Sequence, residues 1–136
     1  MATYNKFNSF VEALAEGKHN LASDTLKVAF SNASNAPSAS ADVKLADITT
    51  IAAPAVDTTT LTVSSSSQTS GTYKLVVADL TMTASADVGP FQYVIIYNDT
   101  HLDKPLIAWY DYGSEVTLAT GDTFKLDFGT ELFSLA

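Results

Sequence analysis

The chain has 136 residues, of which 46% are hydrophobic and 16% are charged, with a net charge of −8 and no cysteine. This length and composition predict a single folded domain over residues 1–136. The acidic balance disfavours nucleic-acid binding, and the lack of cysteine excludes disulfides, thiolate catalysis and cysteine-ligated zinc. No apolar run is long enough to predict a membrane span, and the first ten residues lack a signal-peptide pattern, so we expect synthesis in the cytoplasm and no membrane partner.

The first element that the sequence predicts is a short α-helix at residues 5–16. Four apolar residues share one stripe at the helical spacing i, i+3, i+4 and i+7: Phe7, Phe10, Val11 and Leu14. The stripe fits two roles. It can pack on a sheet as ordinary core, or Tyr4, Phe7 and Phe10 can dock on a neighbouring subunit.

After this helix, short runs of alternating apolar and polar residues predict strands. The expected strands are 25–31, 58–64, 72–78, 80–84, 91–98, 106–112, 115–118 and 123–128. The run 43–51 favours a further strand over a helix. Small polar residues at 32–42 predict a flexible loop, and turns are expected at 65–71 and at Gly113-Ser114. The apolar tail 129–136 is expected to pack or pair.

The stretch 89–112 is expected to form the centre of the fold. Residues 91–98 are apolar on both faces of the predicted strand, so this strand needs cover on both sides and belongs inside a sheet. Its partner is the run 106–112. About eight short strands after one helix predict a mainly-β fold, either an antiparallel β-sandwich or a barrel.

Residues that carry chemistry are sparse. His19 follows the helix, where a protonated imidazole interacts favourably with the helix dipole. His101 lies between Asp99 and Asp103 in a turn that we expect to be solvated. These aspartates lack the ligand spacing of a calcium loop, and no phosphate-binding, nucleophile-elbow or zinc motif is present. The sequence therefore predicts no enzyme, no catalytic residue, no metal and no cofactor.

Aromatic residues are the remaining candidates for a functional surface. Those of the 89–112 stretch fit core packing, a subunit interface or a sugar-binding platform. We take six residues as the candidate interface: Tyr4, Phe7, Phe10, Trp109, Tyr110 and Tyr112.

Three stretches resemble a family of small structural proteins encoded by tailed bacteriophages. They are ATYNKFNSFVEALAEGKHNL…DTLKVAFSN, SSSSQTSGTYKLVVAD, and GPFQYVIIYNDT…KPLIAWYDYGSEVTLATGDTFKLDF. The resemblance covers nearly the whole chain, is weakest across 32–60, and carries over no catalytic residue. It implies a component of the virion.

Within a virion, an acidic domain suits the outer capsid surface better than the DNA-filled interior. The expected role is that of a capsid decoration (cement) protein, which buries apolar surface across the joints between capsomers. Its partner would be the major capsid protein, and a homotrimer would match the three-fold positions of the shell. The alternative is a tail or tail-fibre module that binds a host surface glycan through Trp109, Tyr110 and Tyr112, or through the loop around His101.

Overall fold

A computed structural model of the chain describes residues 2–136, and these form nine strands, one short α-helix and no closed barrel. The elements are β1 (Thr3–Lys6), α1 (Asn8–Ala15), β2 (Leu26–Ser31), β3 (Val63–Thr69), β4 (Thr72–Val77), β5 (Leu80–Thr83), β6 (Val88–Asn98), β7 (Leu106–Leu118), β8 (Thr123–Leu126) and β9 (Phe133–Leu135). Short 3₁₀ turns lie at Ala33–Asn35 and Leu45–Asp47. The predicted mainly-β fold with one N-terminal helix is confirmed.

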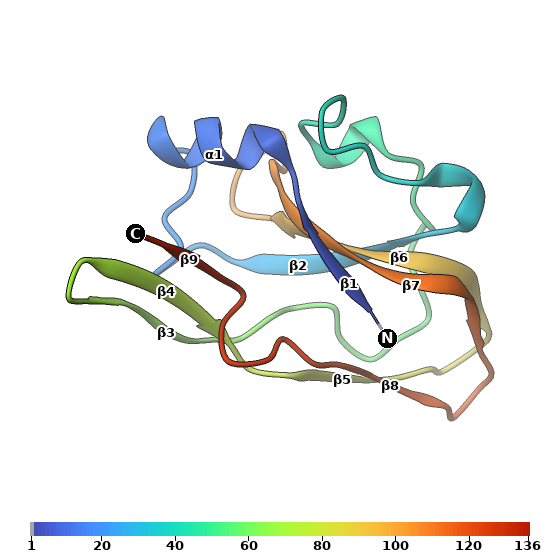
Figure 1. Cartoon of the computed structure of the whole chain (residues 1–136). Coiled ribbons are helices and arrows are strands. Elements are labelled where there is room, and N and C mark those ends of the chain that lie inside the picture. Colours follow the sequence, from blue (N-terminus) through green and yellow to red (C-terminus); the bar gives the residue numbers. More distant parts are fainter. Residues whose placement is uncertain (1) are drawn as a thin grey trace.

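The strands form two layers, with helical and loop segments above them (Figure 1). The upper sheet has the order β1-β7-β6-β2, and the lower layer holds the sheets β3-β4-β9 and β5-β8. Every strand pairing in these sheets is antiparallel. No helix among the described residues is long and apolar enough to cross a membrane.

The central position of the β6–β7 hairpin is confirmed. Apart from Gln92, every residue of β6 from Phe91 to Asn98 is buried. Above the sheet, Phe7 packs on Trp109 with ring centroids 4.6 Å apart. Below it, Phe91 packs edge-on against Phe124 of β8 at 5.2 Å. Cover on both faces is what a strand with apolar residues on both sides requires.

The predicted helix at 5–16 begins too early, because the chain ahead of it is a strand. Residues Thr3–Lys6 pair with β7, and the amide of Phe7 extends this ladder by donating to the carbonyl of Ile107 at 3.1 Å. The helix therefore begins at Asn8. The four residues TYNK of β1 contain a single apolar side chain, too few for an alternating pattern to show.

Three expectations between residues 43 and 71 are wrong. Of the strand expected at 58–64, only Val63 and Ser64 lie in a strand, and Thr60 makes a single isolated bridge to Lys27. No strand forms at 43–51, because the Asp47 carboxylate accepts hydrogen bonds from the amides of Val43 and Lys44 and stabilises a 3₁₀ turn instead. The serine run expected to be a turn is most of strand β3, paired in register with β4. The turn consists of Ser70 and Gly71, both with positive φ.

The turn expected at Gly113 is a bulge inside one long strand. Phe91 of β6 pairs with Val116 of β7, and Tyr93 pairs with Asp111. The two β6 residues are two positions apart, whereas their β7 partners are five positions apart. The three extra residues bulge out, with Gly113 at φ 76° and its amide donating to the Asp111 carboxylate at 2.8 Å. The predicted strands 106–112 and 115–118 are thus parts of β7.

The remaining segments follow the predictions more closely. The tail pairs, as expected, through β9 along β4. The loop 32–42 is held by hydrogen bonds from the amide of Ser38 to the Asp42 carboxylate at 2.7 Å and from the amide of Asn8 to the carbonyl of Ala39 at 3.0 Å. Its flexibility stays a prediction.

Two leucines of the β6–β7 connection provide a test of the core. Leu106 is completely buried, whereas Leu102 at the loop tip is 100% exposed. We expect Leu106→Ala to lower the free energy of unfolding by about 2–5 kcal/mol, because it removes buried methyl groups and leaves a cavity. The matched control Leu102→Ala should change it by less than about 0.5 kcal/mol. Urea denaturation of both variants measures the difference, and equal effects would contradict the assigned core.

Candidate functional site

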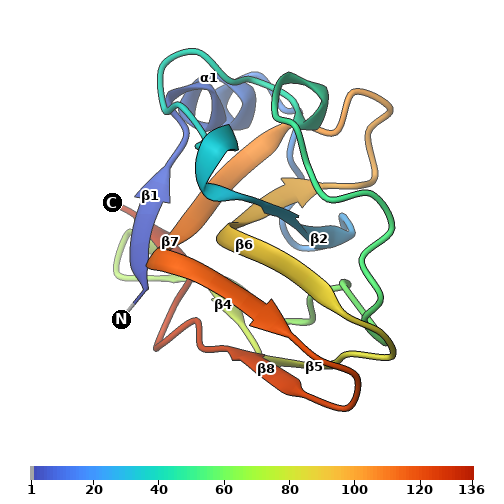
Figure 2. The same cartoon turned by 90° about the vertical axis from the view of Figure 1, so that its right-hand side faces the viewer.

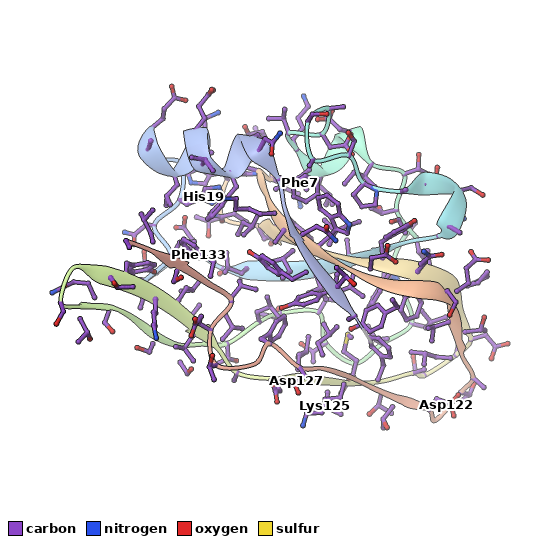
Figure 3. All side chains as sticks on the ribbon, viewed as in Figure 1. Phe7, His19, Asp122, Lys125, Asp127 and Phe133 are labelled. Atoms are coloured by element: carbon purple, nitrogen blue, oxygen red, sulfur yellow. The ribbon has the colours of Figure 1, made fainter. Side chains whose placement is uncertain are left out.

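A groove of about 790 Å³ opens at one flank of the sandwich, between β1 of the upper sheet and the C-terminal segment 125–134. We call it the flank groove. Its lining residues are Ala2, Tyr4, Lys6, Tyr110, Tyr112, Lys125, Asp127, Phe128, Gly129, Glu131, Leu132, Phe133 and Ser134. Figure 3 labels Lys125, Asp127 and Phe133 along the wall that the C-terminal segment forms.

Strand pairing builds the aromatic floor of the flank groove. Tyr4 of β1 lies directly opposite Tyr110 of β7, and their rings meet edge to face with centroids 5.6 Å apart. Tyr112 follows two residues along β7 and packs edge-on against Phe124 at 5.2 Å. The ring of Phe128 lies 5.9 Å from that of Tyr110. The lower layer thus supports the floor without closing the groove.

The tyrosine hydroxyls of the floor are free to bind a partner. Those of Tyr4, Tyr110 and Tyr112 make no hydrogen bond to any described residue; Tyr4 is 37% exposed, and the hydroxyls of Tyr110 and Tyr112 are not completely buried. Burial raises the pKa of Tyr4 and of Tyr112 to about 12 in each case. Burial, with Asp127 and Asp79 nearby, also raises the pKa of Tyr110. All three hydroxyls stay protonated at neutral pH and can donate hydrogen bonds.

The rim of the groove carries charges of both signs. Lys125 pairs with Asp79 at 3.5 Å, and Glu131 with Lys74 at 3.8 Å. Lys6 has no ion pair within residues 2–136. An aromatic floor, free hydroxyls and a mixed rim equip the groove for noncovalent binding of a partner.

The structure divides the six predicted interface residues into two groups. Tyr4, Tyr110 and Tyr112 come together in the flank groove. Phe7 and Phe10 are 0% and 1% exposed, and Trp109 is buried against Phe7, so these three belong to the core under α1. An interface role for Phe7 and Phe10 is contradicted by this burial. Trp109 points away from the groove because adjacent residues of a strand face opposite sides of a sheet.

Several groove residues were missing from the sequence-based set. Phe128 ends the strand expected at 123–128, and Glu131 and Phe133 belong to the tail 129–136, which is expected only to pack or pair. The apolar character of Phe128 and Phe133 is visible in the sequence. Their position beside β1 is not, because it depends on pairings between distant parts of the chain.

The expectation for His19 is wrong, because its ring is buried and neutral. Asn98 donates through Nδ2 to His19 Nδ1 at 3.0 Å and to the Asp24 carboxylate at 2.7 Å, while its Oδ1 accepts from the amide of Thr100. These partners orient the Asn98 amide and make His19 Nδ1 an acceptor. Burial lowers the pKa of His19 to about 4, outweighing the opposite effect of Asp24. His101 approaches the same Asp24 carboxylate at 3.7 Å.

Within residues 2–136, no group of three or more His, Asp or Glu side chains is arranged to hold a metal ion. Compared with protein-family models, with curated proteins and with solved structures, the chain matches none of them. The sequence resemblance and the geometry of the flank groove are the two features that bear on function.

The buried His19 gives a testable dependence of stability on pH. Its pKa of about 4 in the folded protein lies below the value of about 6.5 expected in the unfolded chain, so the unfolded chain binds more protons in this range. The contribution to stability is complete above pH 6.5 and is lost as the pH falls towards 4. We expect the free energy of unfolding to drop by up to about 3 kcal/mol over this interval.

Two asparagine variants separate this effect from general acid destabilisation. His19→Asn keeps an acceptor for Asn98 but cannot titrate, so its unfolding free energy should vary much less between pH 6.5 and 4.5. His101→Asn should keep the dependence of the parent protein. Urea denaturation at several pH values measures both, and a parent protein equally stable at pH 6.5 and 4.5 would contradict the neutral, buried state of His19.

Proposed function

We propose that this protein is a non-enzymatic virion structural protein of a tailed bacteriophage, which decorates and stabilises the outer head shell. The observation that carries the proposal is the flank groove, which brings Tyr4, Tyr110 and Tyr112 together on one concave surface, with Tyr4 exposed, Tyr112 half-buried and Tyr110 9% exposed at its floor. The resemblance of the sequence to small phage structural proteins indicates the type of assembly. The groove supplies a surface by which such a protein attaches.

The partner in this proposal is the major capsid protein. Tyrosine is enriched at protein interfaces, because its ring buries a large apolar area while its hydroxyl still finds a hydrogen-bond partner. A few such residues in a concave pocket supply most of the binding free energy of a typical interface. Each copy adds a modest contribution, and many symmetric copies together stabilise the shell.

Charge and symmetry complete the proposal. A net charge of −8 repels packaged DNA, which favours a position on the outside of the shell. We propose that the protein is synthesised in the host cytoplasm and assembles on the outer capsid surface as a homotrimer. Three copies would match the three-fold positions of an icosahedral lattice.

The second candidate is a tail-associated module that binds a host surface glycan. The same groove favours it, because tyrosine rings can stack on sugars and the carboxylates of Asp127 and Glu131 can accept hydrogen bonds from sugar hydroxyls. The other residues invoked for this role do not line the groove: Trp109 is buried against Phe7, and His101 lies near Asp24.

Binding to heads that lack the protein tests the proposal. Tyr4 is 37% exposed in the groove, whereas Val11 is 54% exposed on α1, outside it. We expect Tyr4→Ser to weaken binding by about tenfold or more, as for a central aromatic residue of an interface. The control Val11→Ser should bind as the parent protein does.

Quantitative gels of sedimented heads give the bound fraction, with circular dichroism to check folding. Equal binding by Tyr4→Ser and the parent protein would exclude the groove as the attachment surface. Failure of the folded parent protein to bind heads would contradict the decoration role itself.

A further inference from the structure

Strand β1 is an edge strand whose outer side is unpaired, because the upper sheet has the order β1-β7-β6-β2 (Figure 2). In an antiparallel ladder, alternate residues direct their N–H and C=O groups towards the partner strand and away from it. The amide of Phe7 donates to the carbonyl of Ile107, and the ladder runs without a register shift from Thr3. The backbone N–H and C=O groups of the odd-numbered residues therefore point towards β7. Those of Tyr4 and Lys6 point towards the free edge.

These backbone groups have no partner among the described residues. Neither the amide nor the carbonyl of Tyr4 or Lys6 takes part in a hydrogen bond outside the β1–β7 ladder, and the ladder itself uses the odd-numbered residues. The free edge therefore offers two donors and two acceptors in a row, at the spacing of a β-strand. This arrangement is a template for one further strand.

The free edge lies on the flank groove, so a strand added there would also fill the groove. Tyr4 and Lys6 line the groove with their side chains, and Phe133 and Ser134 face them from the opposite wall. Side chains of a strand alternate between the two faces of a sheet. Every second side chain of an added strand would thus lie over the aromatic floor, while its backbone pairs with β1.

We propose that the flank groove takes an extended segment of the major capsid protein as a fifth strand of the upper sheet, beside β1. The identity of this partner rests on the function proposed above. Backbone hydrogen bonds provide affinity in this mode of recognition, and alternate side chains provide specificity. The segment places apolar side chains over Tyr110 and Tyr112 and an acidic side chain near Lys6, whose ammonium group has no ion pair within residues 2–136.

A second copy of this chain is a poorer occupant. Its long connection between β2 and β3 is hydrogen-bonded to β2. The amide of Ile51 donates to the carbonyl of Phe30 at 2.8 Å, and the amide of Leu61 donates to the carbonyl of Leu26 at 2.9 Å. This connection is therefore held against its own sheet rather than free to extend into a neighbouring copy. Pairing of two β1 edges would bring together two chains that each carry a charge of −8.

Two substitutions at one position isolate the backbone contribution. Lys6→Pro removes the outward amide, and proline is tolerated on an edge strand where its position faces solvent. Lys6→Ala removes the same side-chain charge but keeps the amide, so it is the matched control. We expect Lys6→Pro to bind heads lacking this protein about tenfold more weakly than Lys6→Ala, through the lost hydrogen bond and the blocked edge.

Hydrogen exchange on the unsubstituted protein provides a second measurement that does not depend on the folding of Lys6→Pro. The amides of Tyr4 and Lys6 should exchange rapidly in the free protein and become protected on heads. Unprotected amides on heads, or equal binding by folded Lys6→Pro and Lys6→Ala, would overturn strand addition while leaving the decoration role intact. A parent protein that does not bind heads would overturn both proposals. A dimer in light scattering that Lys6→Pro dissociates would assign the edge to a second copy and overturn the capsid segment as its occupant.

Discussion

The burial of the β6–β7 hairpin on both faces is the constraint on which the rest of the structure depends. A strand with apolar side chains on both sides is stable only if something covers each face. The helix and the loops beside it cover the upper face, and the smaller sheets of the lower layer cover the other. The surrounding buried residues form one core cluster around this hairpin.

The flank groove lies where the lower layer stops covering the edge of the upper sheet. The lower layer supports Tyr110 and Tyr112 through Phe128 and Phe124, but its C-terminal segment stops short of sealing Tyr4 at the edge of the upper sheet. The result is an aromatic surface held by paired strands, in which Tyr4 is exposed and Tyr110 is largely buried. In the proposed attachment to a head shell, such pairing would limit the conformational freedom lost on binding.

Much of the central fold could be predicted from the sequence, because the order of apolar and polar residues along a strand indicates which faces of that strand are buried. The runs around Val28, Leu75, Ile95 and Leu126 alternate or stay apolar, and each forms a strand. Segments whose structure depends on distant partners could not be predicted in this way. Strand β1 and the serine-rich β3 carry no such pattern and form only because β7 and β4 pair with them.

The candidate site was likewise predictable from the sequence only in part. Residue type was sufficient to select Tyr4, Tyr110 and Tyr112, but it also selected Phe7 and Phe10, which are buried in the core, Phe7 ahead of α1 and Phe10 within it. Which aromatic residues reach the surface depends on the β1–β7 register. The bulge at Gly113 is a further example, because a glycine after a strand predicts a turn unless the partner strand continues past it.

Imaging of intact virions at a resolution that shows side chains would locate this protein in the particle. We expect regular density for it on the outer head shell, in many symmetric copies, with the groove of Tyr4, Tyr110 and Tyr112 against the major capsid protein. Density confined to the tail, in a few copies, would contradict the decoration role and favour the glycan-binding candidate for the same groove.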